Sequence, residues 1–515
     1  MKKLLLSLAL VSSSVLAGVE IKESPSSVSA ELDGKVLWTF NHDPAEGKPY
    51  FHPLASTDGT SFTDLRPKDH PWHRGVWFSW KYINGVNYWE ESRETGKSKG
   101  ETRITNIERE AGSEQGVRLK LDLEYAPTES KAVVMKEHRS LFISPPDETG
   151  AYTIDWSSEF QALEKDLVLD RTPILGEPKG KAHGGYAGWS VRMNKDMIGG
   201  AFLNSESEEG ADRKPAAWMQ FKSPNGGSLL FMDHPDNLNY PSKWYLAQGM
   251  PYYSPAVIHD GPHTIQAGEV LKLHYRLVVA PVAMTAEAAS KHWENWTSSK
   301  VVILTGANNH KWKETTPVLE AILEGSGRFD VDVVEDPEQL TAEFLTNYDV
   351  LLSNWNAYGK SKPAPWPEQL KKAYIVFVRK GGGHVAVHAG SSSFDKWDDY
   401  HAICCASWKK GETGHGKPHK FEVRISTPAH PAVQGLENFE TTDELWFRPL
   451  VHPDAEVIAE SFSETTGNWE PTALVSQFGK GRCFTLLLGH DSEKMKKPGF
   501  KKLFISGTEW AAEIR

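Results

Sequence analysis

The hydrophobic pattern of this 515-residue chain changes near residue 285, and this change constrains the fold more than any other feature. Before it, short runs of β-branched and aromatic residues, such as Ser27–Leu37 and Tyr152–Phe160, are separated by Asp-Gly, Asn-Gly and Gly-Gly pairs. Such runs and turn signals are typical of antiparallel strands. Residues 18–284 are therefore expected to form a large antiparallel β-sandwich.

The pattern after residue 285 is that of alternating helices and strands. Good helix formers follow Thr285, which predicts a connecting helix over residues 285–299. The run Val301-Val-Ile-Leu-Thr-Gly is continuously apolar, as strands buried on both faces are. Strand-like and helix-like segments then alternate as far as Cys483–Leu488. Residues 300–515 are thus expected to form an α/β domain with a doubly wound parallel sheet, which makes the chain multidomain.

Composition excludes some partners. The chain has 57 basic and 68 acidic residues, a net charge of −11, so no basic excess is available to neutralise nucleic acid. No apolar run reaches the roughly 18 to 20 residues that a membrane span needs. The 19 Trp residues fit either a Trp-rich core or aromatic platforms for sugar rings, and composition does not choose between them. The oligomeric state is not indicated.

The first residues have the pattern of an export signal. Lys2 and Lys3 precede an apolar stretch that ends in Val15-Leu16-Ala17, a small-x-small cleavage site. Residues 1–17 are therefore expected to be a cleavable signal peptide, and the protein to be periplasmic or secreted. Because Val19 follows Gly18 where a lipoprotein signal requires Cys, no lipid anchor is expected.

The cysteines do not form a disulfide framework, because there are only three of them: Cys404, Cys405 and Cys483. Neighbouring cysteines rarely bridge each other. A bridge from Cys404 or Cys405 to Cys483 and three free thiols both remain open.

Polar residues follow the strands of the second half, where sites of doubly wound sheets lie. His384 and His388 are four residues apart on one strand, roughly 13 Å, so they cannot bind one ion, and His388 at the strand end is the better candidate. The polar residues expected at this sheet edge or on the loop near it are His310, Asn354, Asn356, His388, His415, His419, His490 and Asp491.

These residue types suggest metal-assisted or acid–base chemistry. Neutral imidazoles with a carboxylate suit a divalent ion, zinc most of all, so His310, His415 and His419 are assigned to metal or to proton transfer. We assign catalysis to His388, His490 and Asp491, and substrate binding to Asn354 and Asn356. No nucleotide or organic cofactor is expected. The alternative is that each histidine is a surface or capping residue.

The second half resembles the ThuA-like (trehalose-utilisation) family over nearly all of residues 300–515. The resemblance rests on Val301–Pro317, Asp349–Asn356, Gly381–Gly390, Gly414–His419, His430-Pro431, Asp443-Glu444-Leu445, Glu470-Pro471 and the stretch from Gly479 to Asp491. It implies a fold like that of class I glutamine amidotransferases and a role in sugar utilisation, including routes through 3-keto glycosides. The amidotransferase Cys nucleophile follows a central strand, where this chain has His388, so glutamine hydrolysis is not expected.

The first half contains a dense histidine motif, Asp69-His70-Pro-Trp-His73-Arg74-Gly-Val-Trp-Phe-Ser79. With His52 upstream, it predicts a polar pocket with aromatic walls that binds a sugar or a carboxylated ligand through His52, His70, His73 and Arg74. The alternative is a turn set by Pro71 and Gly75 and capped by His70.

This half resembles the PmoA-like family, the DUF6807 group, over most of residues 40–280. The resemblance rests on Phe51-His-Pro-Leu54, on the histidine motif and on Asn84-Gly-Val-Asn-Tyr-Trp89. By analogy it implies a large sandwich like those of galactose mutarotase-type proteins.

Both halves indicate carbohydrate, which leaves three hypotheses. The first is an exported enzyme, a glycoside hydrolase or lyase, that cleaves or modifies a glycoside, including a 3-keto glycoside, in the second half. The second is a non-catalytic carbohydrate-binding protein whose amidotransferase-like site has lost its nucleophile. The third places catalysis in the sandwich and leaves the second half as scaffold.

Overall fold

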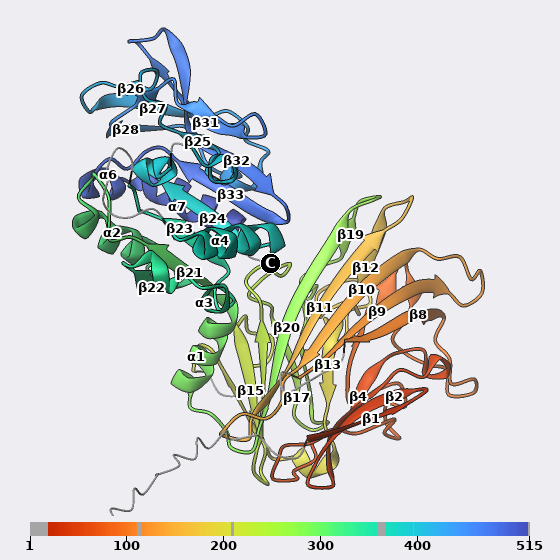
Figure 1. The fold of residues 1–515 in the computed structure, drawn as a ribbon. Coiled ribbons are helices and arrows are strands. Elements are labelled where there is room, and N and C mark those ends of the chain that lie inside the picture. The colour runs from red at the N-terminus through yellow and green to blue at the C-terminus, as the bar shows by residue number, and fades with distance from the viewer. Residues whose placement is uncertain (1–18, 111–115, 208–210, 358–365, 395, 513–515) are drawn as a thin grey trace, which may run out of the picture. The chain divides into compact units, whose positions relative to one another are not determined.

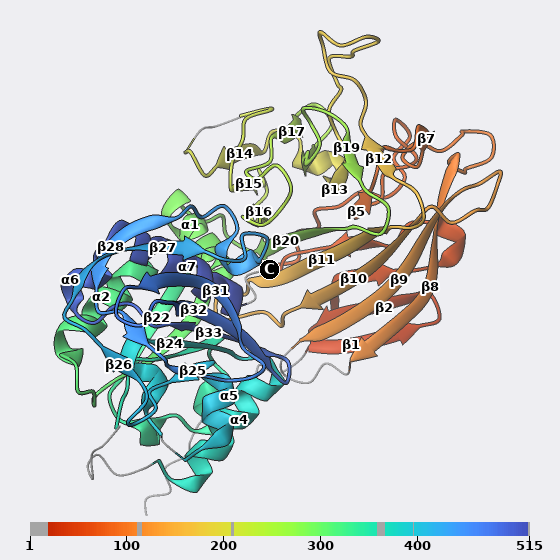
Figure 2. The same ribbon diagram turned by 90° about the horizontal axis from the view of Figure 1, so that it is seen from above.

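The computed structural model describes residues 19–110, 116–207, 211–357, 366–394 and 396–512, so the predicted signal peptide lies outside the described residues. The chain divides into two compact units, Met1–Trp293 and Glu294–Arg515 (Figures 1 and 2). The helix expected between the halves is α1 (Ala286–Thr297), and the boundary falls inside it. Thr285 Oγ1 accepts a hydrogen bond from the Ala288 amide at 3.2 Å and caps its first turn.

The first unit is built from three antiparallel sheets. The first has the strand order β1 (Val19–Ser24), β2 (Ser27–Leu32), β3 (Lys35–Asn41), β4 (Tyr50–Leu54), β5 (Val76–Ser79), β13 (Gly188–Arg192), β18 (Tyr252–Pro255) and β17 (Trp244–Ala247). The second has the order β14 (Ala201–Asn204), β15 (Trp218–Lys222), β16 (Ser228–Asp233), β20 (Val270–Ala280), β11 (Tyr152–Ala162), β10 (Met135–Ile143), β9 (Val117–Pro127) and β8 (Gly100–Glu110). A small third sheet contains β19 (His263–Ile265), β12 (Leu167–Asp170), β6 (Tyr82–Ile83) and β7 (Val86–Asn87).

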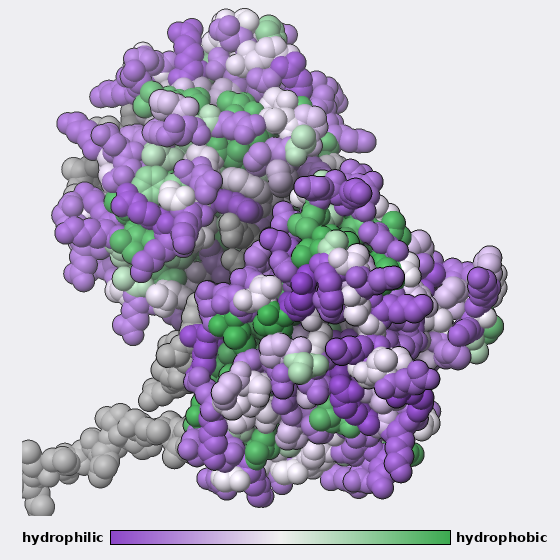
Figure 3. All heavy atoms as spheres, turned by 90° about the vertical axis from the view of Figure 1, so that its right-hand side faces the viewer, coloured by the Kyte–Doolittle hydropathy of each residue, from purple (hydrophilic) through white to green (hydrophobic). Residues whose placement is uncertain are grey.

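The two large sheets pack face to face, which confirms the predicted antiparallel sandwich. Strand β9 alternates buried and exposed residues along most of its length, so one face is apolar and the other polar. The face of the molecule drawn in Figure 3 is mostly hydrophilic, with scattered hydrophobic patches. Between the sheets, Phe78 packs on Phe160 at 5.1 Å between ring centroids, and Trp156 packs on Trp189 at 5.1 Å. Most of the fully buried large side chains are Trp, so the core accounts for much of the Trp content.

One predicted strand, Ser27–Leu37, is a hairpin instead. Asp33 and Gly34 have φ values of +50° and +76°, and β2 pairs with β3 on either side of them. Left-handed conformation at both central residues gives the tight turn that suits the twist of a hairpin, and Asp-Gly is a preferred pair for it.

The second unit contains a nine-stranded mixed sheet. Its strand order is β22 (Phe329–Val334), β21 (Ser299–Leu304), β23 (Val350–Ser353), β24 (Gly383–Val387), β33 (Gly481–Leu486), β32 (Asn468–Phe478), β31 (Glu456–Ser463), β27 (His419–Ile425) and β28 (Phe439–Asp443). Strands β22 to β33 pair in parallel, which confirms the predicted α/β sheet. The remaining four pair antiparallel and extend the sheet beyond what the sequence indicated.

Helices cover both faces of the parallel strands. The longer helices are α2 (Trp312–Glu324), α4 (Glu368–Lys380) and α7 (Pro498–Ala511), and the shorter ones are α3 (Ala342–Leu345), α5 (Asp398–Ile403) and α6 (Ser492–Met495). Val301 and Ile303 of β21 belong to the core that contains α2 and α7, whereas Val302 and Leu304 belong to the core that contains α4 and α5. The continuous apolar run is therefore buried on both faces.

Cys404, Cys405 and Cys483 are buried free thiols in the second of these two cores. Burial raises the pKa of Cys405 to about 11, so its thiolate is not available near neutral pH. No helix in the described part of the chain is long and apolar enough to cross a membrane.

His384 on β24 is fully buried beside the Tyr374 ring, and burial lowers its pKa to about 3. A histidine whose pKa is lower in the folded state than in the unfolded chain takes up its proton mainly on unfolding. Stability is then lost as the pH falls through the unfolded pKa of about 6.5.

We predict that His384→Leu makes the protein less sensitive to acid. Between pH 7.5 and 5.5 the wild type should lose about 1.4 kcal/mol more unfolding free energy than the variant. Urea unfolding at the two pH values measures the difference. His419→Gln, at an exposed position, is the control and should lose as much unfolding free energy as the wild type. If His384→Leu also loses as much as the wild type, the assignment is contradicted.

Candidate metal centre

His388 lies at a sharp turn directly after strand β24. Its φ is +48°, a left-handed conformation that costs a non-glycine residue of order 1–3 kcal/mol and is typical of functional sites. Gly390 makes the turn possible, because a Cβ there would lie 2.1 Å from the Ser353 carbonyl oxygen. A 3-10 helix, η4 (His388–Ser392), continues the chain. The sequence thus fixes His388 at the carboxyl end of a buried strand.

The tautomer of His388 is set by its hydrogen bond. His388 Nδ1 lies 2.7 Å from the Leu487 carbonyl oxygen, which can only accept, so Nδ1 carries the proton. Nε2 is left with a lone pair, is buried and has no hydrogen-bond partner among the described residues. A buried acceptor without a partner is costly unless a ligand satisfies it.

The imidazoles of His310 and His490 lie in the loops that follow strands β21 and β33. In the loop after β21, Asn308 Oδ1 accepts a hydrogen bond from the His310 amide at 2.9 Å and lies 3.3 Å from His310 Nδ1. After β33, the buried Asp443 accepts hydrogen bonds from the amides of Gly489 at 2.7 Å and His490 at 3.2 Å. Both loops are therefore held by side-chain acceptors.

Glu444, at the end of β28, completes the cluster. Its Oε1 lies 3.7 Å from His388 Nε2, and its Oε2 lies 3.2 Å from His490 Nδ1. One ligand atom from each of His310, His388, Glu444 and His490 lies within 4.8 Å of those of the other three. Three imidazoles and one carboxylate are a common donor set for zinc and similar ions. The residues therefore fit a divalent cation.

The charge states of the cluster suit metal binding. Burial, together with His388 and His490, lowers the pKa of His310 to about 3, and burial lowers the pKa of His388 to about 4. Contact with Glu444 raises the pKa of His490. Burial acts to raise the pKa of Glu444, but His490 and His388 outweigh it and keep the pKa below its usual value. Two imidazoles and the carboxyl group are thus in their ligand forms at neutral pH.

A cavity of about 300 Å³ opens onto the cluster. Its aromatic wall is formed by Trp408 and Trp446, whose rings meet edge to face at 5.2 Å. His415 also lines it and places Nδ1 2.9 Å from Glu444 Oε2. The lining residues are Asn309, His310, Asn356, Ala389, Ser392, Trp408, His415, Glu444, Trp446 and His490. Polar groups in an aromatic cavity are typical of sites for small polar ligands.

Other predicted residues lie outside the cluster. Asn354 is buried and donates to the hydroxyls of Thr315 and Thr316, so it joins the end of β23 to helix α2 rather than lining the cavity. Asp491 caps helix α6 by accepting from the amides of Glu493 and Lys494. His419 is exposed and packs on Phe421. The cluster therefore differs in composition from the metal set assigned by sequence, since it contains His310 of that set together with His388, Glu444 and His490.

Glu444 was not assigned a role from the sequence. It follows no parallel strand but lies between β28 and β29 (Trp446–Phe447), on the antiparallel side of the sheet. Its one signal was the Asp443-Glu444-Leu445 motif within the family resemblance.

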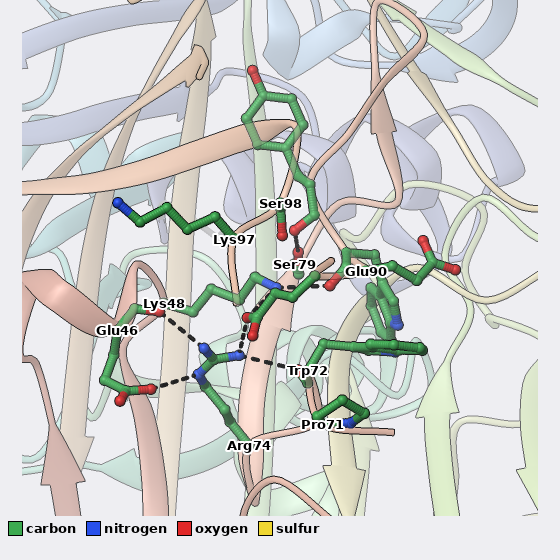
Figure 4. A network of polar contacts seen from close by, with 12 residues as sticks. Glu46, Lys48, Pro71, Trp72, Arg74, Ser79, Glu90, Lys97 and Ser98 are labelled. Atoms are coloured by element: carbon green, nitrogen blue, oxygen red, sulfur yellow. Dashed lines mark hydrogen bonds and ion pairs between the residues drawn. The ribbon is translucent and has the colours of Figure 1, made fainter. Parts of the chain in front are cut away.

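In the first unit, His70 and His73 line a cavity of about 260 Å³, whereas His52 and Arg74 do not. His52 Nδ1 is 2.9 Å from the Thr63 hydroxyl. Arg74 is fully buried and pairs with Glu46 at 3.2 Å (Figure 4). It also pairs with Glu91 at 2.6 Å. Because Arg74 is fully buried and pairs with these two carboxylates, it supports the motif and does not line the cavity.

Comparison with known sequences places the first unit in a family. Residues 27–294 match the model described as "Family of unknown function (DUF6807)". The chain belongs to the DUF6807 family. Residues 300–511 match a second model, described as "Trehalose utilisation" (ThuA), so the DUF6807 unit is followed by a ThuA-like unit. The label PmoA-like is not among these descriptions.

Solved structures similar to the chain include three of different kinds. A putative ThuA-like protein from Parabacteroides merdae is 29% identical with a TM-score of 0.38, over 42% of this chain and 90% of that chain. A glutamine amidotransferase from Thermotoga maritima is 13% identical with a TM-score of 0.28, over 42% and 98%. A β-galactosidase from Rahnella sp. R3 is 14% identical with a TM-score of 0.31, over 45% and 34%. No curated protein matches the chain.

We predict that Asp443→Ala destabilises the ThuA-like unit by about 1–3 kcal/mol, because it leaves the amides of Gly489 and His490 without their acceptor. Asp443→Asn should lower the unfolding free energy by less than Asp443→Ala does, because Asn keeps one acceptor oxygen. Urea unfolding measures both changes. Asp454→Ala, at an exposed position, is the control, and an equal loss there would remove the special role of Asp443.

Proposed function

We propose that the ThuA-like unit binds a divalent cation, zinc first, through His310, His388, Glu444 and His490, and uses it to cleave or modify a glycoside. The observation that carries the proposal is the buried Nε2 of His388, which has no hydrogen-bond partner in the part of the chain that the structure describes and lies beside three other ligand groups. A lone pair in this position is stabilised by an ion. The name of the matched family, trehalose utilisation, supports a carbohydrate as substrate.

The residues around the cluster suit a sugar. Trp408 and Trp446 present indole faces on which a pyranose ring can stack, and the amides of Asn309 and Asn356 offer hydrogen bonds to hydroxyls. Asn356 Nδ2 already donates to the Ala389 carbonyl at 2.6 Å, so its oxygen is oriented. Together these groups would hold a sugar oxygen next to the cluster.

A bound cation would supply Lewis acidity to a sugar oxygen or to water. His415 is the group best placed to move a proton, because it lies at the cavity wall with about half of its side chain exposed and Nδ1 against Glu444. The Glu444 carboxylate holds both His415 and His490 and orients their rings. The signal expected over residues 1–17 would bring such an enzyme to glycans outside the cytoplasm.

We predict about one tightly held divalent ion per chain in the full-length protein. His388→Ala, His490→Ala and Glu444→Gln should each weaken zinc affinity by about tenfold or more, because each removes a donor. Elemental analysis and competition with a zinc chelator give stoichiometry and affinity. His419→Ala is the matched control, since this histidine is exposed and outside the cluster.

The reaction is tested with glycosides and 3-keto glycosides. Turnover should stop on chelation, return with zinc, and fall in His415→Ala while zinc affinity stays within a few-fold of the wild type. A protein that stays metal-free when supplied with zinc would falsify the metal site. Binding of sugar and metal without turnover of any glycoside would favour a carbohydrate-binding protein.

A further inference from the structure

The cavity in the DUF6807 unit is separate from the metal centre and is built from one unit alone. Three loops and two strands contribute to it: the histidine motif, the segment after β7, the segment before β13, and strands β17 and β18. Its lining residues are His70, His73, Trp89, His183, Tyr186, Tyr245, Met250 and Tyr252. At about 260 Å³ it lies just below the range of about 300–1,000 Å³ typical of sites for drug-sized ligands, so its ligand is small.

The walls of this cavity are aromatic. His73 is only 3% exposed and lies between rings, stacked on Tyr252 at 5.4 Å and tilted against Trp77 at 5.1 Å. Trp89 packs on Tyr186 at 5.1 Å, and Tyr186 packs on Tyr245. Because these rings are already packed against each other, the cavity is preformed and presents fixed ring faces.

Polar groups are placed at the same cavity. His70 stacks on His73 at 4.7 Å, and its Nδ1 lies 2.9 Å from Asp69 Oδ2. Burial acts to raise the pKa of Asp69, but His70 and Arg192 outweigh it and lower the pKa to about 2, so Asp69 is a carboxylate. Asp69 thus accepts the Nδ1 proton of His70 and leaves Nε2 as a hydrogen-bond acceptor. His73 Nδ1 is buried without a hydrogen-bond partner within the described ranges.

Charge around the cavity is neutralised within the fold. None of the lining residues is Asp, Glu, Lys or Arg. Lys48 is buried nearby and donates to the Trp89 carbonyl at 2.8 Å, while Glu91 pairs with Lys48 at 3.6 Å and with Arg74 at 2.6 Å. Arg192 pairs with Asp69 at 2.9 Å. None of these charged side chains lines the cavity, so a ligand with a formal charge would gain no direct ion pair with the lining, which disfavours its desolvation.

We propose that this cavity is a second, metal-independent site that binds one neutral pyranose ring. The C–H face of the sugar would stack on Trp89, Tyr186 or Tyr245, and its hydroxyls would reach the imidazoles. His70, held by Asp69, accepts a hydrogen bond from a sugar hydroxyl through Nε2. The site does not depend on the function proposed for the ThuA-like unit.

The test is a binding titration of the full chain in the His388→Ala background with EDTA, so that the other cavity lacks its cation. The probes are methyl glucoside, methyl galactoside, trehalose and cellobiose, with glucuronate as the charged comparison. Tryptophan fluorescence and saturation-transfer NMR report binding. At least one neutral sugar should bind, and at least tenfold more tightly than glucuronate.

Variants assign the binding to this cavity. His70→Ala and His183→Ala change side chains that are partly or fully exposed, so both should fold, and His70→Ala should weaken sugar affinity at least tenfold. His138→Ala is the matched control, because His138 forms the same type of pair with Asp122 at 2.6 Å at an exposed position of strand β10 and does not line the cavity. It should bind sugar as the parent does.

Three results would overturn the proposal. The first is that no neutral sugar binds. The second is that glucuronate binds more tightly than the neutral sugars. The third is that sugar binding is unaffected by both His70→Ala and His183→Ala. None of these results bears on the metal proposal, since zinc affinity is measured separately.

Discussion

The buried carboxylate of Asp443 is the interaction on which the site of the ThuA-like unit depends. It accepts from the amides of Gly489 and His490 and thereby joins the end of the antiparallel strand β28 to the end of the parallel strand β33. Glu444 is the next residue along the chain, so the same contact sets the distance between Glu444 and His490. Without it, two of the four cluster residues would sit on independent loops.

Much of this site could be predicted from the sequence, because one physical rule applies to three of its residues. Parallel strands that alternate with helices end at one edge of the sheet, and His310, His388 and His490 each follow such a strand. The apolar strands expected at Val301, His384–His388 and Cys483–Leu488 were sufficient to place them. The rule says nothing about Glu444, because that residue is brought in by antiparallel strands added to the far side of the sheet.

Local chemistry explains why some residues that the sequence assigned to the sites lie outside the cluster and the cavities. Asp491 precedes the short helix α6, and a side chain that caps a helix uses its acceptors on backbone amides. His415 belongs to the short strand β26 (Gly414–His415) and His419 begins strand β27, so the loop expected around both is confined to the three residues between them, and only His415 lines the cavity. In the DUF6807 unit, the spacing of the histidine motif did not reveal that Arg74 faces Glu46 and Glu91 while His70 and His73 face the cavity.

The stability of the ThuA-like unit gives a further argument for a ligand at its cluster. A left-handed backbone at His388 and an Nε2 atom without a hydrogen-bond partner among the residues described each disfavour the fold by about 1–3 kcal/mol. Burial lowers the pKa of His310 and His388, so both imidazoles stay uncharged near neutral pH. They therefore do not gain a proton that would compensate for this loss of stability. Four potential donors that face one another at such distances would be stabilised together by one cation, whereas no single hydrogen bond within the chain would satisfy them all. The same reasoning does not extend to His384, which is also buried and unpartnered among the described residues but has an aromatic ring, not other donors, beside it.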